Sequence, residues 1–324
     1  MTLQGVVRGR RRPPRIVLYG PAGIGKSTFG ASAPQSIFVP TEDGVDNVPV
    51  DQFEKVQTWE DVQARLQQVA TEKHNYRTVV LDTLNGAVDL AAEMVCKNQY
   101  GGQWTAKKGD GGFLGWAQGW KSTAQTIRSI LRTLDYCRKR DMTVILLAHT
   151  GLHNVRHPSQ GDYTKFAPEM DKAIWSPICA WADMVLRADY EYVVVPGKSK
   201  MAKGRAVGSS VRKLYTVGSA AEDAKTRAGY ELPEVMDLDW LAIENELGKP
   251  NVTIQEVQLL WNIMDEEQSM KALAYLGVDS ATALDSADLH KLKIMLNRLR
   301  MLHAEQAAAQ DSETEDETTI AGAA

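Results

Sequence analysis

The chain has 324 residues, of which 44% are hydrophobic and 24% charged, as is typical of a globular protein that buries a sizeable core. Its three cysteines, Cys96, Cys137 and Cys179, are widely spaced with no CxxC pair, which excludes a disulfide framework and a zinc ribbon and favours a cytoplasmic protein. The net charge is −4, and no apolar run approaches the roughly 20 residues of a membrane-spanning helix, so we expect no membrane partner.

The predicted elements alternate between strands and helices over residues 15–245. Short apolar runs predict buried strands at 15–19, 36–39, 78–81 and 143–148, with strand-like runs at 190–195 and 211–217. Apolar residues at helical spacing predict helices at 58–71, 86–96 and 116–140. Glycine-rich or polar stretches predict long loops at 100–115 and 150–169. Wholly apolar strands that alternate with helices indicate an α/β fold with a mostly parallel sheet covered on both faces.

The two ends of the chain differ from this core. A capping box of Thr253 and Glu256 begins a run of helical segments, so we predict a small helical C-terminal domain at 250–303. We expect a basic flexible arm over residues 1–14 and an acidic disordered tail over residues 304–324. The arm would contact nucleic acid or remain solvated, and the tail would contact a partner or remain solvated.

A phosphate-binding motif follows the first predicted strand. The sequence GPAGIGKS fits G-x-x-x-x-G-K-[ST] between a strand and a helix-compatible stretch. The backbone N–H groups of such a loop face phosphate oxygens, its lysine contacts the β- and γ-phosphates, and its serine hydroxyl binds Mg²⁺. We therefore predict that ATP and Mg²⁺ bind here. The predicted nucleotide-binding residues are Gly20, Pro21, Ala22, Gly23, Ile24, Gly25, Lys26, Ser27 and Thr28.

Two acidic residues lie just after predicted strands. Asp82 follows strand 78–81 and is the predicted second Mg²⁺ ligand beside Ser27, the alternative being a carboxylate that caps the next helix. Residue 83 is threonine, whereas many helicases and packaging motors have a glutamate there that activates water. Glu42, which follows strand 36–39 at the same edge of a parallel sheet, is therefore the candidate general base, the alternative being an exposed loop acid.

His149 ends the predicted strand 143–148, where it would hydrogen-bond the γ-phosphate. His149, His153 and His157 are four residues apart, which on a helix would form a metal-binding face. Gly151 and the proline at 158 argue against a regular helix there. We therefore favour a phosphate sensor at His149 over a metal site.

These motifs, in this order over about residues 15–240, resemble the RecA-like recombinase ATPases, especially phage-encoded recombination proteins of Sak type. The stretch Thr41-Glu42-Asp43-Gly44 resembles the segment that carries the general base in that family. The resemblance implies a RecA-like P-loop NTPase core, single-stranded DNA bound by loops 100–115 and 150–169, and a homo-oligomer that is a filament or a ring. RecA itself has an asparagine–glutamine pair where this chain has His149.

The sequence Lys225-Thr226-Arg227 resembles the K-x-R element of RecA-like ATPases. The resemblance implies that Lys225 and Arg227 reach the γ-phosphate bound by a neighbouring subunit and take part in catalysis there. Two residues that are two apart on an extended segment face the same side. The alternative is a solvated basic turn.

Aromatic and basic residues in the two loops suit unpaired bases and phosphates. The candidates are Trp104, Lys107, Lys108 and Phe113 in the first loop, and Arg156, Tyr163, Lys165 and Phe166 in the second. Trp116 and Trp120, four apart on the next helix, are expected to pack in the core instead.

We therefore expect an ATP-dependent, single-stranded-DNA-binding recombinase or annealing protein, in the host cytosol if a phage encodes it. Its acidic tail would be available to a single-strand-binding protein. The alternatives are a hexameric helicase or packaging-type DNA motor, and an ATP-switched regulatory or scaffold protein that does not act on DNA. A small-molecule kinase is disfavoured because residues 100–115 supply no arginine for a lid.

Overall fold

The computed structural model describes residues 11–45, 48–105, 111–159, 161–195 and 205–248. The chain divides into two units, residues 1–247 and 248–324, and the fold described is that of the first. The predicted helical domain at 250–303 and the acidic tail lie outside the described residues, as does most of the basic arm. These three assignments stay predictions.

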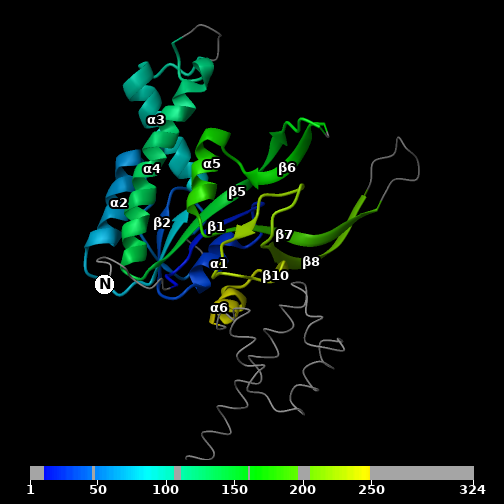
Figure 1. The fold of residues 1–324 in the computed structure, drawn as a ribbon. Coiled ribbons are helices and arrows are strands. Elements are labelled where there is room, and N and C mark those ends of the chain that lie inside the picture. Colours follow the sequence, from blue (N-terminus) through cyan, green and yellow to red (C-terminus); the bar gives the residue numbers. More distant parts are fainter. Residues whose placement is uncertain (1–10, 46–47, 106–110, 160, 196–204, 249–324) are drawn as a thin grey trace, which may run out of the picture. The chain divides into compact units, whose positions relative to one another are not determined.

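Ten strands of the described residues form one sheet in the order β10-β8-β7-β1-β5-β4-β2-β3, with β6 paired to β5 and β9 to β7. The six strands from β7 to β3 pair in parallel, and β8 and β10 add an antiparallel edge (Figure 1). The strands are β1 (Arg15–Gly20), β2 (Ser36–Pro40), β3 (Asp51–Gln52), β4 (Thr78–Asp82), β5 (Thr143–Val155), β6 (Tyr163–Pro168), β7 (Met184–Val195), β8 (Arg205–Tyr215), β9 (Lys225–Thr226) and β10 (Val235–Asp237).

Helices cover both faces of this sheet. They are α1 (Lys26–Ser32), α2 (Trp59–Thr71), α3 (Leu84–Tyr100), α4 (Gln118–Lys139), α5 (Lys172–Trp181) and α6 (Trp240–Gly248), with a 3₁₀ turn at Gly115–Ala117. The predicted α/β fold with a mostly parallel sheet is confirmed. Among the described residues, no helix is long and apolar enough to cross a membrane.

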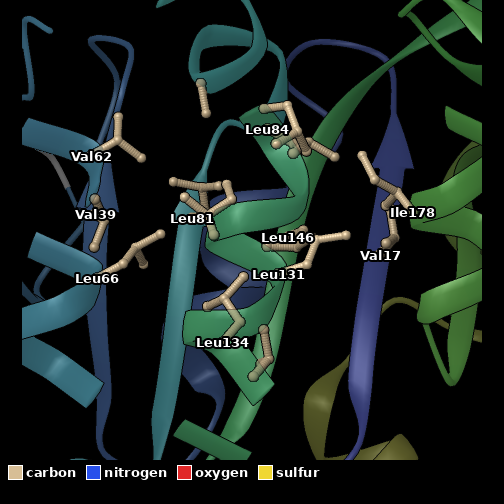
Figure 2. Packing of buried hydrophobic residues seen from close by; sticks show 14 of the residues in the cluster. Val17, Val39, Val62, Leu66, Leu81, Leu84, Leu131, Leu134, Leu146 and Ile178 are labelled. Carbon is tan, nitrogen blue, oxygen red and sulfur yellow. The ribbon is translucent and has the colours of Figure 1, made fainter. Parts of the chain in front are cut away.

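The alternation of side chains along each strand divides the core in two. Val17, Leu81 and Leu146 point to one face, where they pack with residues of α2 to α5 such as Leu66 and Leu134 (Figure 2). Residues one position along each strand point to the other face, which α1 and α6 cover. Both faces of the central strands are therefore buried, which explains why these strands read as continuous apolar runs.

The prediction of a long loop at 150–169 is wrong. β5 does not end at His149 but continues to Val155, and it turns back through β6 as an antiparallel hairpin. Residues from Thr150 paired with Pro168 to Val155 paired with Tyr163 make the ladder. The hairpin is exposed on one side and so lacks an apolar run, and its polar residues gave a loop-like pattern although their backbone groups are paired.

The two strand-like runs at 190–195 and 211–217 belong to the second halves of longer strands, the later of which ends at Tyr215. β7 begins at Met184 and β8 begins at Arg205, and the two pair antiparallel. β1 pairs with β7 only as far as Tyr19 opposite Arg187. The β7–β8 hairpin therefore continues past the end of β1, at the edge of the sheet from which the loop after β1 departs (Figure 1).

Candidate nucleotide-binding site

The predicted phosphate-binding loop connects the end of β1 to the start of α1. Gly23 and Gly25 have φ angles of 75° and 108°, which glycine adopts without a steric penalty. A β-carbon on Gly20 would lie 2.6 Å from the carbonyl oxygen of Ala188, so the loop leaves β1 where only glycine fits. The structure thus gives GPAGIGKS the strand–loop–helix setting that its pattern predicts.

Lys26 is the first residue of α1, and it is only 7% exposed. Its ammonium group donates hydrogen bonds of 3.0 Å each to the carbonyl oxygens of Gly20 and Pro21. Burial lowers the pKa of Lys26, while the charges of Asp82 and Glu42 act in the opposite direction. The positive charge therefore lies inside the loop and faces two carboxylates.

Ser27 and Asp82 come together as predicted. The Ser27 hydroxyl donates a 2.6 Å hydrogen bond to Oδ2 of Asp82, which is the last residue of β4. Burial raises the pKa of Asp82, and the Ser27 hydrogen bond and the Lys26 charge partly offset this effect. A hydroxyl and a carboxylate oxygen are hard donors of the kind Mg²⁺ prefers, so this pair fits the metal that the motif implies.

Glu42 lies between Thr83 and His149. Its carboxylate accepts a 2.5 Å hydrogen bond from the Thr83 hydroxyl, and its other oxygen lies 3.0 Å from Nε2 of His149. Burial acts to raise the pKa of Glu42, but the hydrogen bonds of Thr83 and His149 and the charges of His149 and Lys26 outweigh it and lower the pKa. Glu42 is therefore a partly exposed carboxylate whose two oxygens each have a neighbour, and its role as general base stays a prediction.

A second layer of hydrogen bonds fixes these strand ends. Thr41 donates to the carbonyl oxygen of Thr83 at 2.9 Å and accepts from its amide at 2.8 Å, which ties the end of β2 to the end of β4. Asn85 accepts from the His149 amide at 2.8 Å and donates to the Glu169 carbonyl oxygen at 2.7 Å. These polar groups were missed in the sequence because only the parallel order of the strands brings them together.

The loop, the two carboxylates and His149 line one pocket of about 400 Å³. A neighbouring pocket of about 590 Å³ shares Glu42 and His149 with it and extends to the β5–β6 hairpin. His149 is a mid-strand residue rather than the end of a strand, because β5 continues beyond it. In the described part of the chain, no group of three or more His, Cys, Asp or Glu side chains could hold a metal ion.

Lys225 and Arg227 do not line the pocket that contains Lys26. β9 pairs with Met184 and Val185, at the start of β7, so both residues lie away from the loop of their own chain. The Arg227 guanidinium contacts Asp183 at 3.5 Å and the carbonyl oxygen of Ala180. Their action on a neighbouring subunit stays a prediction.

One predicted DNA contact in the first loop is wrong. Phe113 is 0% exposed and packs between Tyr100, Trp104 and Trp120, with its ring against Gly119. Trp120 is partly buried and packs against the core, in line with the expectation. Trp104 remains 43% exposed, whereas Lys107 and Lys108 and the side chain of Trp116 lie outside the described residues.

The four predicted DNA contacts in the β5–β6 hairpin segment fall into two groups, two that are exposed and two that contact other residues of the chain. Arg156 and Tyr163 are exposed. Lys165 makes a 2.5 Å ion pair with Asp223, and the Phe166 ring lies 5.0 Å below the Arg187 guanidinium. Two of the four predicted contacts in this segment are therefore already engaged within the chain.

A parallel sheet whose first strand leads through a glycine-rich loop into a helix, with carboxylates supplied from neighbouring strand ends, defines a P-loop NTPase. Residues 12–228 match the family model described as "AAA domain", and the chain belongs to this P-loop NTPase family.

One curated relative is the SPbeta prophage-derived uncharacterized protein YorG of Bacillus subtilis (strain 168). It is 23% identical to this chain over 175 residues. The match covers 53% of this chain and 49% of that protein, so the chain spans about half the length of the relative.

Proposed function

We propose that this protein hydrolyses ATP with Mg²⁺ at the pocket around Lys26, and that single-stranded DNA stimulates the hydrolysis in recombination or annealing. One observation carries the first part of the proposal. Lys26, Asp82 and Glu42 come from β1–α1, β4 and β2, and they converge on a single pocket. A binding loop needs only the lysine, whereas two carboxylates from neighbouring strand ends suit phosphoryl transfer to water.

The chain's own groups have separate roles in this proposal. Ser27 and Asp82 would hold Mg²⁺, which supplies positive charge to the phosphate oxygens. Lys26 now donates to two backbone carbonyls, and a triphosphate would offer it charged acceptors, which form hydrogen bonds roughly twice as strong. Glu42 would accept a proton from the attacking water, while Thr83 and His149 hold its two oxygens in place.

The test of the ATPase activity is phosphate release by the full chain at varied Mg²⁺ concentration. Wild-type protein is expected to release phosphate only with Mg²⁺, and Asp82→Asn is expected to need more Mg²⁺ for the same rate. Asp43→Asn is the matched control, because Asp43 lies in the same pocket but forms an exposed ion pair with Lys55. Phosphate release by Asp82→Asn at the wild-type rate and Mg²⁺ dependence would contradict the proposed site.

The coupling to DNA is supported by two features. The β5–β6 hairpin continues directly from His149, the partner of Glu42. Arg156 follows the last residue of β5 and Tyr163 begins β6, so a ligand on these exposed residues would bind at the far end of the hairpin whose first strand carries His149. The relative encoded by a prophage is also consistent with a protein of phage recombination.

The corresponding assay compares ATP hydrolysis with and without single-stranded DNA, for wild-type protein and for Arg156→Ala and Tyr163→Ala. We expect single-stranded DNA to stimulate ATP hydrolysis by the wild-type protein, and this stimulation to be weaker in both variants and to fall with added salt. Hydrolysis that is indifferent to DNA would refute the coupling and favour the ATP-switched scaffold. Processive strand displacement would favour the helicase instead.

A further inference from the structure

A second cation besides Lys26 lies at the phosphate-binding loop, and it comes from the antiparallel edge of the sheet. Arg212 pairs with Tyr190 in the β7–β8 hairpin, three positions beyond the last β7 residue that pairs with β1. This part of the hairpin stands beside the point where the loop leaves β1. The antiparallel strand β8 is therefore the element that brings Arg212 to the nucleotide pocket.

The face of β8 also directs Arg212 toward the loop. Arg212 and Leu214 are two residues apart and share one face of the strand. Leu214 is fully buried with Phe29 of α1 and Trp240 of α6. Lys213 points to the opposite face, where it makes a 2.7 Å ion pair with Asp237. Arg212 therefore lies on the face covered by α1, the helix that follows the loop.

Arg212 contacts the loop itself. A β-carbon built on Gly25 would lie 2.9 Å from Nη1 of Arg212, so the guanidinium lies against the backbone of the loop. Arg212 lines the pocket of about 400 Å³ together with Lys26 and Ser27. Arg212 is also an exposed residue, so an incoming anion can reach it.

Three arginines on or beside the central strands have carboxylate partners. Arg15 and Arg138 both pair with Asp183, and Arg187 pairs with Asp189 and Glu222. Within the described residues, the Arg212 guanidinium forms no ion pair. A cation that is left without a carboxylate beside a phosphate-binding loop is suited to bind an anionic ligand.

We propose that Arg212 contacts the phosphate chain of the bound nucleotide from within the same chain. This role rests on the proposed nucleotide site and adds to it a positive charge that needs no second subunit. A guanidinium presents several N–H donors in a fixed plane, and it can make two parallel hydrogen bonds to phosphate oxygens. Lys225 and Arg227, by contrast, would reach a nucleotide only across an interface.

The test is the affinity of the full chain for ATP and for inorganic tripolyphosphate, measured by titration calorimetry for wild type, Arg212→Ala, Arg212→Lys and Lys213→Ala. The loss of charge-assisted hydrogen bonds in Arg212→Ala should lower the affinity for both ligands by about 10- to 100-fold. Arg212→Lys should lie between Arg212→Ala and wild type. Lys213→Ala, which removes a neighbouring cation from the opposite face, should match wild type.

The outcomes are distinguishable. Wild-type protein that binds neither ligand would refute the proposed function and the role of Arg212 with it. Wild-type protein that binds ATP while Arg212→Ala binds it within about twofold of wild type would refute the role of Arg212 alone. A loss of ATP affinity without a loss of tripolyphosphate affinity would refute a phosphate contact. Thermal melts of each variant check that the fold is kept.

Discussion

Replacement of Asp183 by asparagine should destabilise the protein strongly, because this carboxylate joins the starts of β1 and β7. Its side chain is 3% exposed. It accepts hydrogen bonds from the Arg15 amide at 3.0 Å and from the Arg15 guanidinium at 3.0 and 2.9 Å, and it lies 3.1 Å from Arg138. Removing one partner of a buried ion pair costs about 3–5 kcal/mol. For a domain of this size, that loss lowers the melting temperature by about 6–20 °C.

The assay is thermal and urea unfolding followed by circular dichroism. Asp135→Asn is the matched control, because Asp135 also pairs with Arg15 at 3.0 Å but its side chain is 39% exposed, so its loss costs less than about 1 kcal/mol. The reasoning would be refuted if the two substitutions destabilised the protein equally, or if Asp183→Asn lowered the free energy of unfolding by less than about 1 kcal/mol. Arg227 also contacts Asp183, so the substitution perturbs that contact together with those of Arg15 and Arg138.

The pH dependence of this effect has a definite sign. Burial acts to raise the pKa of Asp183, but the hydrogen bonds and charges of Arg15 and Arg138 outweigh it and lower the pKa. The folded protein therefore binds fewer protons than the unfolded chain between the two pKa values. The stabilisation is present above the unfolded pKa and is lost as the pH falls through the folded pKa. The difference between wild type and Asp183→Asn should shrink accordingly in acid.

Three further predictions concern the pocket and the first loop. Glu42→Gln should reduce ATP hydrolysis by about 10²- to 10⁴-fold in single-turnover assays while ATP still binds, and an unchanged rate would exclude Glu42 as the base. Asp82→Asn should raise the melting temperature in Mg²⁺-free buffer at neutral pH. Burial raises the pKa of Asp82 in the folded protein, so ionisation of Asp82 destabilises the fold. This destabilisation begins as the pH rises above the unfolded pKa and is complete only above the folded pKa. A lower melting temperature would contradict this sign. Phe113→Ala should destabilise the protein by about 3–5 kcal/mol in urea unfolding, because the ring is fully buried, and a neutral effect would restore Phe113 as a surface contact.

The central strands and the loop were predictable from the sequence because each has a strong local signal. Fully buried parallel strands read as apolar runs, and GPAGIGKS is a specific pattern. The positions of Asp82 and Glu42 followed from one further rule, that the carboxyl ends of parallel strands share an edge of the sheet.

What was missed depends on contacts between distant segments. β5 beyond His149 pairs with β6 and carries no apolar run, so it resembled a loop. Phe113 lies in a glycine-rich stretch and is buried only because Tyr100 and Trp120 close around it. Arg212 faces the pocket because of the register of the β7–β8 hairpin, which a strand-like run alone does not reveal.

The most direct measurement is ATP affinity with and without Mg²⁺ for wild type and Lys26→Ala. The lysine is buried in the loop and donates to two carbonyl oxygens that a triphosphate would replace. Wild-type protein should bind ATP more tightly with Mg²⁺, and Lys26→Ala should lose that affinity while its thermal melt remains cooperative. Equal ATP binding by a folded Lys26→Ala protein would contradict the proposed site.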